Sequence, residues 1–141
     1  MNTLIRDVLT VRDIETTTPN TTVLAAVATM NDRHIGSLLV IEEERPIGIL
    51  TERDILVRVV EAGRDPATTP VAQVMTRELV LIDLETSVVE AMTIMTERRC
   101  RHLPVVDGNR LCGLVSSGDL TAWIVQEHQR TIHDLHDYIT H

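Results

Sequence analysis

The feature that most constrains this chain is an internal repeat. Thr18–Asp54 aligns with Asp83–Asp119 without a gap. The identical pairs include Thr21/Thr86, Met30/Met95, Gly48/Gly113 and Asp54/Asp119. Self-similarity at a fixed period indicates a repeat architecture, and two copies are too few for a solenoid. The repeat therefore predicts two like units packed about a pseudo-twofold axis, with a cleft between them in which a ligand could bind.

Chain length and hydrophobicity favour a folded protein outside the membrane. A unit of about 60 residues buries too little surface to be secure alone, so we expect the two copies to share one core. No apolar run approaches the roughly 18 residues of a membrane helix. The N-terminal residues 1–7 lack a basic head followed by an apolar block, which argues against a signal peptide. The expected location is cytoplasmic.

Charge narrows the classes of ligand. The net charge of −8 argues against nucleic-acid binding, which needs a basic face. All 13 basic residues are arginine, and without lysine the chain has neither a P-loop nor Schiff-base chemistry. Arg98, Arg99, Arg101 and His102 lie close together in the sequence. Because arginine binds phosphate bidentately, this cluster favours an anion site, with a solvated helix end as the alternative.

Apolar periodicity predicts the same elements in both copies. In the first copy these are an extended segment at 14–18, a helix opened by Thr21 or Thr22 and running to about His34, strands at 37–41 and 46–50, and a helix at 55–62 that Gly63 ends. The second copy repeats this order, with a hairpin around Gly108-Asn109. We predict an α/β fold of two β-α-β-β-α motifs packed sheet to sheet, with a long C-terminal helix.

The predicted domain boundaries follow from this order. Residues 1–63 form the first motif with its N-terminal segment, 64–70 the linker, 71–128 the second motif and 129–141 a helical tail. A short apolar segment precedes each copy, at 4–9 and 71–75. Cys100 and Cys112 lack metal-type spacing. If Gly108-Asn109 is a two-residue turn, Cys112 faces Val105, and the two cysteines are expected to be buried free thiols.

The sharpest local match is a hydroxyl at a strand end with a carboxylate three residues later. Thr51 precedes Asp54 in the first copy, and Ser116 precedes Asp119 in the second. This spacing is typical of a capping box, in which both groups serve the helix start. A carboxylate there can also accept two hydrogen bonds from a ribose diol, while helix-terminal N–H groups bind phosphate. The two interpretations are compatible.

These segments, together with Gly48–Asp54 and Arg101–Asp107, resemble cystathionine-β-synthase (CBS) domains. Two in tandem make a Bateman module, and the whole chain is similar to small stand-alone bacterial CBS pairs. The resemblance covers Leu4 to about Gln126. It implies a regulatory module that binds an adenosine compound (AMP, ADP, ATP, NAD or S-adenosylmethionine) in the cleft between the motifs.

The resemblance also implies roles for individual residues. Asp54 and Asp119 would bind ribose beside the hydroxyls of Thr51 and Ser116, Arg101 and His102 would reach phosphate with Arg99 nearby, and adenine would lie near Thr17-Thr18 and Leu81-Ile82. The first copy departs from this pattern, because Gly36 and Ser37 stand where the second has Arg101 and His102. Arg33, His34 or Arg53 are possible substitutes. We therefore expect the Asp119 site to favour anionic nucleotides.

The sequence also bears on catalysis, metal binding and assembly. Catalysis needs a nucleophile with its base, a metal or paired acids in one pocket, so we expect a regulator and not an enzyme. His128, His133, His136 and His141 lie in the tail, where a solvated face is favoured over a metal site. An apolar stripe, interrupted at His128, comprises Leu120, Ile124, Ile132, Leu135 and Ile139. Such a stripe packs on something, and a homodimer is favoured. A ligand-free dimerisation scaffold is the alternative function.

Overall fold

The computed structural model describes residues 3–9 and 14–140, and it contains two three-stranded sheets. The first copy comprises β1 (Thr16–Thr17), α2 (Val23–Arg33), β2 (Ser37–Glu42), β3 (Arg45–Thr51), α3 (Glu52–Ile55) and the π-helical η1 (Leu56–Glu61). The second comprises β4 (Ile82–Asp83), α4 (Val88–Arg98), β5 (His102–Asp107), β6 (Arg110–Ser116) and α5 (Ser117–Thr140). The predicted β-α-β-β-α order and the long C-terminal helix are confirmed.

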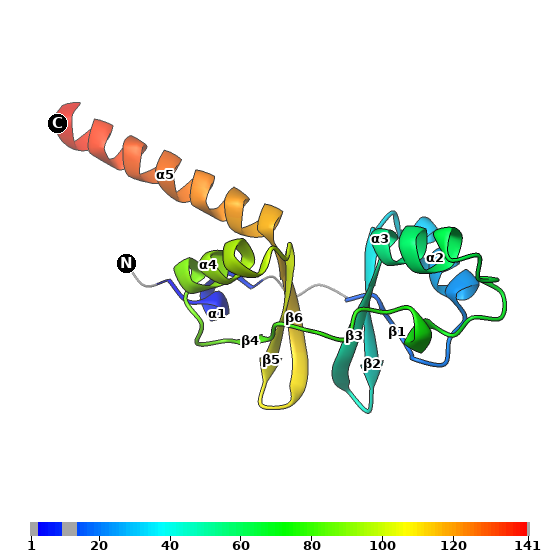
Figure 1. The fold of residues 1–141 in the computed structure, drawn as a ribbon. Helices are drawn as coiled ribbons and strands as arrows, with labels where there is room; N and C mark the ends of the chain where they lie inside the picture. The colour runs from blue at the N-terminus through cyan, green and yellow to red at the C-terminus, as the bar shows by residue number, and fades with distance from the viewer. Residues whose placement is uncertain (1–2, 10–13, 141) are drawn as a thin grey trace.

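The two sheets have the same topology and lie side by side (Figure 1). In each, a short strand pairs in parallel with the first strand of an antiparallel hairpin. The sheets contact each other through β3 and β6, so the hydroxyl-acid segments that follow these strands are brought toward the middle of the molecule. The hairpins are also joined by an ion pair between Arg110 Nε and Glu44 Oε2 at 3.4 Å.

Polar caps define the ends of the first helix in each copy. The Thr22 hydroxyl accepts a hydrogen bond from the Ala25 N–H at 3.2 Å, and the Ser87 hydroxyl accepts one from Glu90 at 3.0 Å. These residues are therefore the N-caps, as the N-cap preference for serine and threonine predicts. Both helices end at a left-handed residue, His34 and Arg99, each with φ of 54°. The equivalence of the two copies thus extends to their helix ends.

A β-bulge interrupts both hairpins and changes the predicted register. Val105 pairs with Gly113 and Val106 pairs with Leu111, so Cys112 is the extra residue. The expectation that Cys112 faces Val105 across the ladder is therefore wrong. Its sulfur instead lies 3.3 Å from the Val105 carbonyl oxygen. Both cysteines are free, and because a bulge redirects side chains, Cys112 is exposed rather than buried.

The apolar segments that precede the copies are exchanged between them. The helix α1 (Ile5–Val8) packs against the second copy, where the Ile5 N–H donates to the Thr86 carbonyl at 2.8 Å. The 3-10 helix η2 (Val71–Gln73) packs against the first copy, where the Val71 N–H donates to the Thr21 carbonyl at 2.8 Å. Each segment therefore completes the copy that it does not directly precede. The domain boundaries along the chain stay a prediction.

The exchange produces two separate cores. Val71, Val74 and Met75 are buried with the helices and sheet of the first copy, while Ile5 is buried with those of the second. The expectation of one shared core is therefore wrong for the described residues. The core of each copy is enlarged by the apolar segment that precedes the other copy. This added buried surface offsets the small size of a unit of about 60 residues.

The repeated glycines lie where the exchanged segments cross the sheets. A Cβ atom on Gly48 would lie 2.6 Å from the Met75 sulfur and 3.0 Å from the Thr76 carbonyl oxygen. A Cβ on Gly113 would lie 2.6 Å from a Leu9 methyl carbon. Thr76 also exchanges both of its backbone hydrogen bonds with Ile49, at 2.8 and 2.9 Å. Gly48 is the more constrained position, because the backbone carbonyl of Thr76 approaches it, whereas the atoms nearest to Gly113 belong to the flexible side chain of Leu9.

We expect Gly48→Ala to destabilise the protein by about 1–3 kcal/mol, the usual cost of overpacking. The reason is that the Thr76 backbone, held by two hydrogen bonds, cannot move away from the added methyl group. Gly118→Ala is the matched control, because its nearest neighbour would be the Ser116 hydroxyl at 3.7 Å. Urea unfolding measures both. Equal stability of the two variants would show that close approach does not constrain Gly48.

The C-terminal helix α5 divides into a packed part and a projecting part (Figure 1). Leu120 is 2% exposed in the core of the second copy, and Trp123 packs against that core. Ile132, Leu135 and Ile139 are 57–79% exposed. The expected stripe from Leu120 to Ile139 is therefore not one continuous surface. Within the described part of the chain, no helix has the length and hydropathy needed to span a membrane.

Candidate functional site

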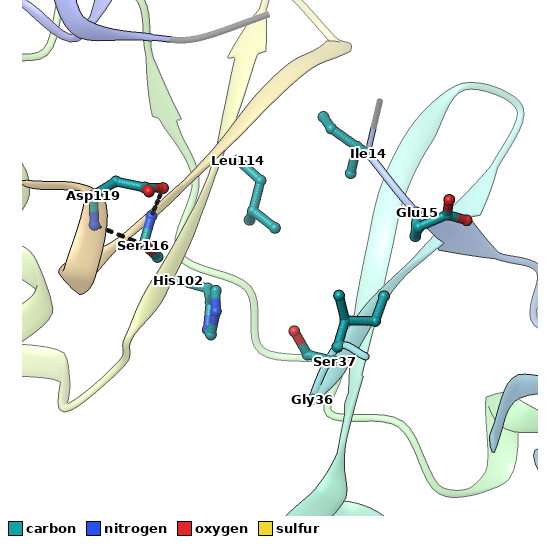
Figure 2. A pocket seen from close by; sticks show the side chains of 9 residues that line it. Ile14, Glu15, Gly36, Ser37, His102, Leu114, Ser116 and Asp119 are labelled. Atoms are coloured by element: carbon teal, nitrogen blue, oxygen red, sulfur yellow. Dashed lines mark hydrogen bonds between the residues drawn. The ribbon is translucent and has the colours of Figure 1, made fainter. Parts of the chain in front are cut away.

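A cavity of about 330 Å³ opens between the two copies (Figure 2). Its lining is formed by Ile14, Glu15, Ile35, Gly36 and Ser37 of the first copy and His102, Leu114, Ser116 and Asp119 of the second. The volume lies at the lower end of the roughly 300–1,000 Å³ range typical of small-molecule sites. The predicted cleft between the copies is therefore present, and both copies contribute to it.

Ser116 and Asp119 form a reciprocal cap at the start of α5, on the wall of the cavity (Figure 2). The Asp119 N–H donates to the Ser116 hydroxyl at 3.0 Å, and the Ser116 N–H donates to Asp119 Oδ2 at 3.1 Å. These are the two hydrogen bonds of a capping box. The carboxylate is half-buried and borders the cavity, so the capping role leaves it positioned to accept a ligand hydroxyl.

The equivalent acid of the first copy is more enclosed. Asp54 is 7% exposed, and its Oδ2 accepts from the Thr51 N–H at 3.0 Å. Its Oδ1 accepts from the Thr76 hydroxyl at 2.9 Å, so the exchanged segment contacts this carboxylate directly. The residue that corresponds to Thr76 in the segment before the first copy is Thr10, which lies outside the described residues. In the structure, Asp54 therefore serves the fold through both of its oxygens.

His102 lies at the start of β5, on the cavity wall opposite Gly36 and the first residue of β2, Ser37. Burial lowers the pKa of its imidazole below the ordinary value, although the Asp119 carboxylate acts in the other direction. The neighbouring Arg101 also lowers this pKa. At neutral pH His102 is therefore an uncharged donor and acceptor rather than a cation.

The lowered pKa of His102 predicts a loss of stability in acid. Below its ordinary pKa of 6.5 the unfolded chain takes up a proton that the folded chain does not, so the free energy of unfolding falls as pH drops through that range. We expect the melting temperature of the wild type to fall more than that of His102→Gln between about pH 6.5 and 5. The other histidines are common to both proteins. Parallel pH profiles would contradict this assignment.

The charge of the cavity differs from the sequence expectation. Among the described residues, its lining contains two carboxylates, Glu15 and Asp119, but no arginine. The Arg33 guanidinium lies outside the lining and pairs with Glu15, at 3.1 Å between Nε and Oε1. Arg101, expected beside Asp119, does not line this cavity. Asp119 instead lies across the cavity from Gly36 and Ser37, because the cavity pairs the loop of one copy with the hydroxyl-acid segment of the other.

The structure brings together three of the ten predicted ligand-binding residues, namely His102, Ser116 and Asp119. Thr51 and Asp54 cap α3 at the corresponding place in the first copy. His34 and Arg99 are helix C-caps, and the Thr18 hydroxyl lies 2.7 Å from that of Thr21. Ile82 is a core residue, and Arg101 is exposed, with its carbonyl accepting from the Ser117 N–H. Their ligand contacts stay predictions.

Sequence reasoning did not select four of the residues that line the cavity. Ile14, Glu15 and Ile35 come from the first copy, and Leu114 from the second. Ile14 lies at the start of the predicted extended segment, and Leu114 lies between Gly113 and Ser116 in the repeated strand. Their positions in the sequence, close to the residues that were predicted to bind the ligand, could have indicated them. Within residues 3–9 and 14–140, no three histidine, cysteine or acidic side chains gather to hold a metal ion.

Comparisons with known proteins agree with this architecture. The model of the CBS domain family matches residues 5–61 and 71–126. The mitochondrial CBS domain-containing protein CBSX3 of Arabidopsis thaliana is 38% identical over 127 residues, which cover 86% of this chain and 62% of that protein. The chain therefore spans less than two thirds of that relative.

Solved structures show the same fold. The structure from Burkholderia ambifaria MC40-6, whose name describes a signal-transduction protein with CBS domains, is 38% identical, with a TM-score of 0.81 over 88% of this chain and 95% of that one. Hypoxic Response Protein I with two coordinated zinc ions is 29% identical, with a TM-score of 0.76 over 85% and 98% of the two chains. A protein of that name from Mycobacterium tuberculosis is 32% identical over 100 residues. With both copies matched, this chain belongs to the CBS domain family.

Proposed function

We propose that this protein is a regulatory module that binds an adenosine compound in the cavity between its two CBS motifs and transmits the signal through a homodimer. The observation that carries the proposal is the cavity itself, because residues of both copies line it and the Ser116–Asp119 segment forms one wall. A ligand there would contact both copies at once. Binding would therefore favour one relative placement of the copies, which a partner chain could detect.

The lining suggests how each part of the ligand would be held. The Asp119 carboxylate would accept hydrogen bonds from the 2′- and 3′-hydroxyls of ribose, as acids do in dinucleotide sites. The aliphatic side chains of Ile14, Ile35 and Leu114 would cover the faces of the adenine ring. In the part of the chain that the structure describes, the lining contains no aromatic residue, so this mode of binding does not use stacking on aromatic rings.

The charge of the lining favours ligands with little negative charge. Glu15 and Asp119 would repel a triphosphate, and His102 is uncharged at neutral pH because its pKa is lowered. We therefore propose that this cavity prefers adenosine or S-adenosylmethionine to ATP, in contrast to the expectation from the sequence. In the cavity, Gly36 and Ser37 of the first copy face Ser116 and Asp119 of the second. The reverse pairing would place Arg101 of the second copy at a second site beside Thr51 and Asp54 of the first.

A calorimetric panel tests the proposal. Adenosine, AMP, ADP, ATP, NAD and S-adenosylmethionine are titrated with and without magnesium, and melting temperature is measured in parallel. A ligand that binds the native state at 100 times its Kd stabilises it by about 2.7 kcal/mol. If none of these compounds at millimolar concentration changes the melting temperature, the sensor proposal fails. The ligand-free dimerisation scaffold then remains, with the exposed C-terminal helix as its supporting observation.

Glu15→Gln tests the proposed charge preference separately. The substitution removes one carboxylate from the lining and releases Arg33 from its ion pair. We expect affinity for AMP and ATP to increase, since arginine forms strong charge-assisted contacts with phosphate, while affinity for adenosine changes little. An equal change for adenosine and ATP would show that the charge of this lining does not select the ligand. Conversion of a bound ligand into a new product would indicate an enzyme instead.

A further inference from the structure

The projecting part of α5 carries an apolar seam with a heptad pattern. Val125, His128, Ile132, Leu135 and Ile139 follow one another at spacings of 3, 4, 3 and 4 residues. At roughly 100° per residue, they lie within about 80° of one another around the helix axis. The apolar members are 49–79% exposed, and His128 is exposed as well. The seam is thus a continuous surface that the rest of this chain does not cover.

The charged residues of the same segment lie on the opposite side of the helix. Glu127, Arg130, His133, Asp134 and Asp137 centre about 180° from the seam. Along this side, Arg130 Nη1 forms an ion pair with Glu127 Oε1 at 3.5 Å, and His133 Nε2 lies 3.2 Å from Asp137 Oδ2. Since the charges avoid the seam and pair with each other, they suit an outer face that stays in water when the seam is covered.

The residue types in the seam indicate what covers it. With Val125, Ile132 and Ile139 at the a positions of the heptad, His128 and Leu135 occupy the d positions. β-Branched residues at a and leucine at d favour parallel two-stranded coiled coils, and a polar residue at a core position sets register at a cost in stability. Figure 1 shows this part of α5 extending away from both copies.

We infer that the C-terminal helix pairs with the same helix of a second copy as a parallel, in-register coiled coil. The inference rests on the homodimer proposed above and specifies how it forms. Each seam would pack against its twin, and the two His128 side chains would meet in one layer, aligning the helices. The ligand-binding bodies would then lie at the same end of the pair. They would be joined by the α5 helices, each of which begins at Ser117, between the cavity residues Ser116 and Asp119.

Charge substitutions in the seam test the contact. We expect light scattering to show wild-type particles of twice the 15.8 kDa of one chain, and Leu135→Asp to shift them to the monomer. Gln126→Asp adds the same charge away from the seam and should leave the dimer intact. Leu135 is 57% exposed, so its substitution spares the folded core. We expect His128→Leu to tighten the dimer at least tenfold, because it removes the polar layer.

A cross-linking variant tests the orientation. In a Cys100→Ser, Cys112→Ser background, Ile139→Cys should form an intermolecular disulfide under mild oxidation, because parallel in-register helices place this position beside its twin. Antiparallel helices would place it near Val125 of the other copy, and no disulfide would form. A Leu135→Asp protein that stays dimeric would overturn the coiled coil while leaving the homodimer. A wild type that is monomeric at all concentrations would overturn both. Neither result depends on ligand binding.

Discussion

Ile5→Ala is expected to lower the free energy of unfolding by about 2–5 kcal/mol, the usual cost of truncating a fully buried aliphatic side chain. Ile5 is 0% exposed in the core of the second copy, although it precedes the first copy in the sequence. The deleted atoms leave a cavity beside α4 and β5, where Val88 and Leu103 are packed. Such a loss is a large part of the 5–15 kcal/mol that stabilises a typical domain.

The copy that loses stability in Ile5→Ala shows whether α1 packs against the second copy, as in the structure, or against the first copy, which it precedes in the sequence. We expect native-state hydrogen exchange to show the largest loss of protection in residues 82–120, rather than in residues 14–62. Leu24→Ala is the control, because Leu24 is 52% exposed and its truncation leaves no internal cavity. If Ile5→Ala selectively exposed the first copy, then α1 would belong with the copy that it precedes, contrary to the structure.

Asp119→Asn is expected to weaken the binding of the adenosine ligand by 1.5–3 kcal/mol, or about 10- to 150-fold, the usual value of a hydrogen bond to a charged group. Asparagine keeps one side-chain oxygen, which can still accept from the Ser116 N–H as Asp119 Oδ2 does. The cap therefore survives while the charge and the second acceptor are lost. We expect the melting temperature without ligand to change little, and calorimetry measures the loss of affinity.

Asp54→Asn is the matched control in the first copy. Both oxygens of Asp54 accept hydrogen bonds within the protein, from the Thr51 N–H and the Thr76 hydroxyl, and the residue does not line the cavity. We expect this substitution to lower stability but to leave affinity at the Asp119 cavity nearly unchanged. Unchanged affinity in Asp119→Asn, with a lowered melting temperature, would reduce Asp119 to a helix cap.

Much of the local structure followed from the sequence because it depends on residues that are close together in the chain. Thr22 and Ser87 cap their helices through side-chain bonds to N–H groups three residues away. Gly108 was predicted to lie in a turn. It adopts a φ of 65° with little conformational strain because it has no side chain. The internal repeat predicted the two sheets because each copy carries the same apolar pattern. These features could be predicted without knowing which segment packs against each copy.

Only the tertiary contacts decided which copy each exchanged segment packs against, because the internal repeat is compatible with either choice. The two copies share the same apolar pattern. Hydrophobic pattern alone therefore cannot show whether Ile5 and Val71 pack against the copy that each precedes or against the other one. The repeat likewise leaves open which residues face Asp119 across the cavity, and the structure places Gly36 and Ser37 of the first copy there. The bulge that exposes Cys112 was likewise invisible, since turn residues alone do not reveal an inserted position.

The sequence by itself therefore determined the repeat, the order of elements and the hydroxyl-acid pairs of Thr51/Asp54 and Ser116/Asp119. It limited the cap of the first repeated helix to Thr21 or Thr22. Only the tertiary structure decided the crossed packing of α1 and η2, the two separate cores and the opposition of Asp119 to the loop of the first copy. The physical reason is that caps and turns are short-range and specific. Burial of apolar surface is non-directional, so it selects between two similar partners only through the packing of the whole chain.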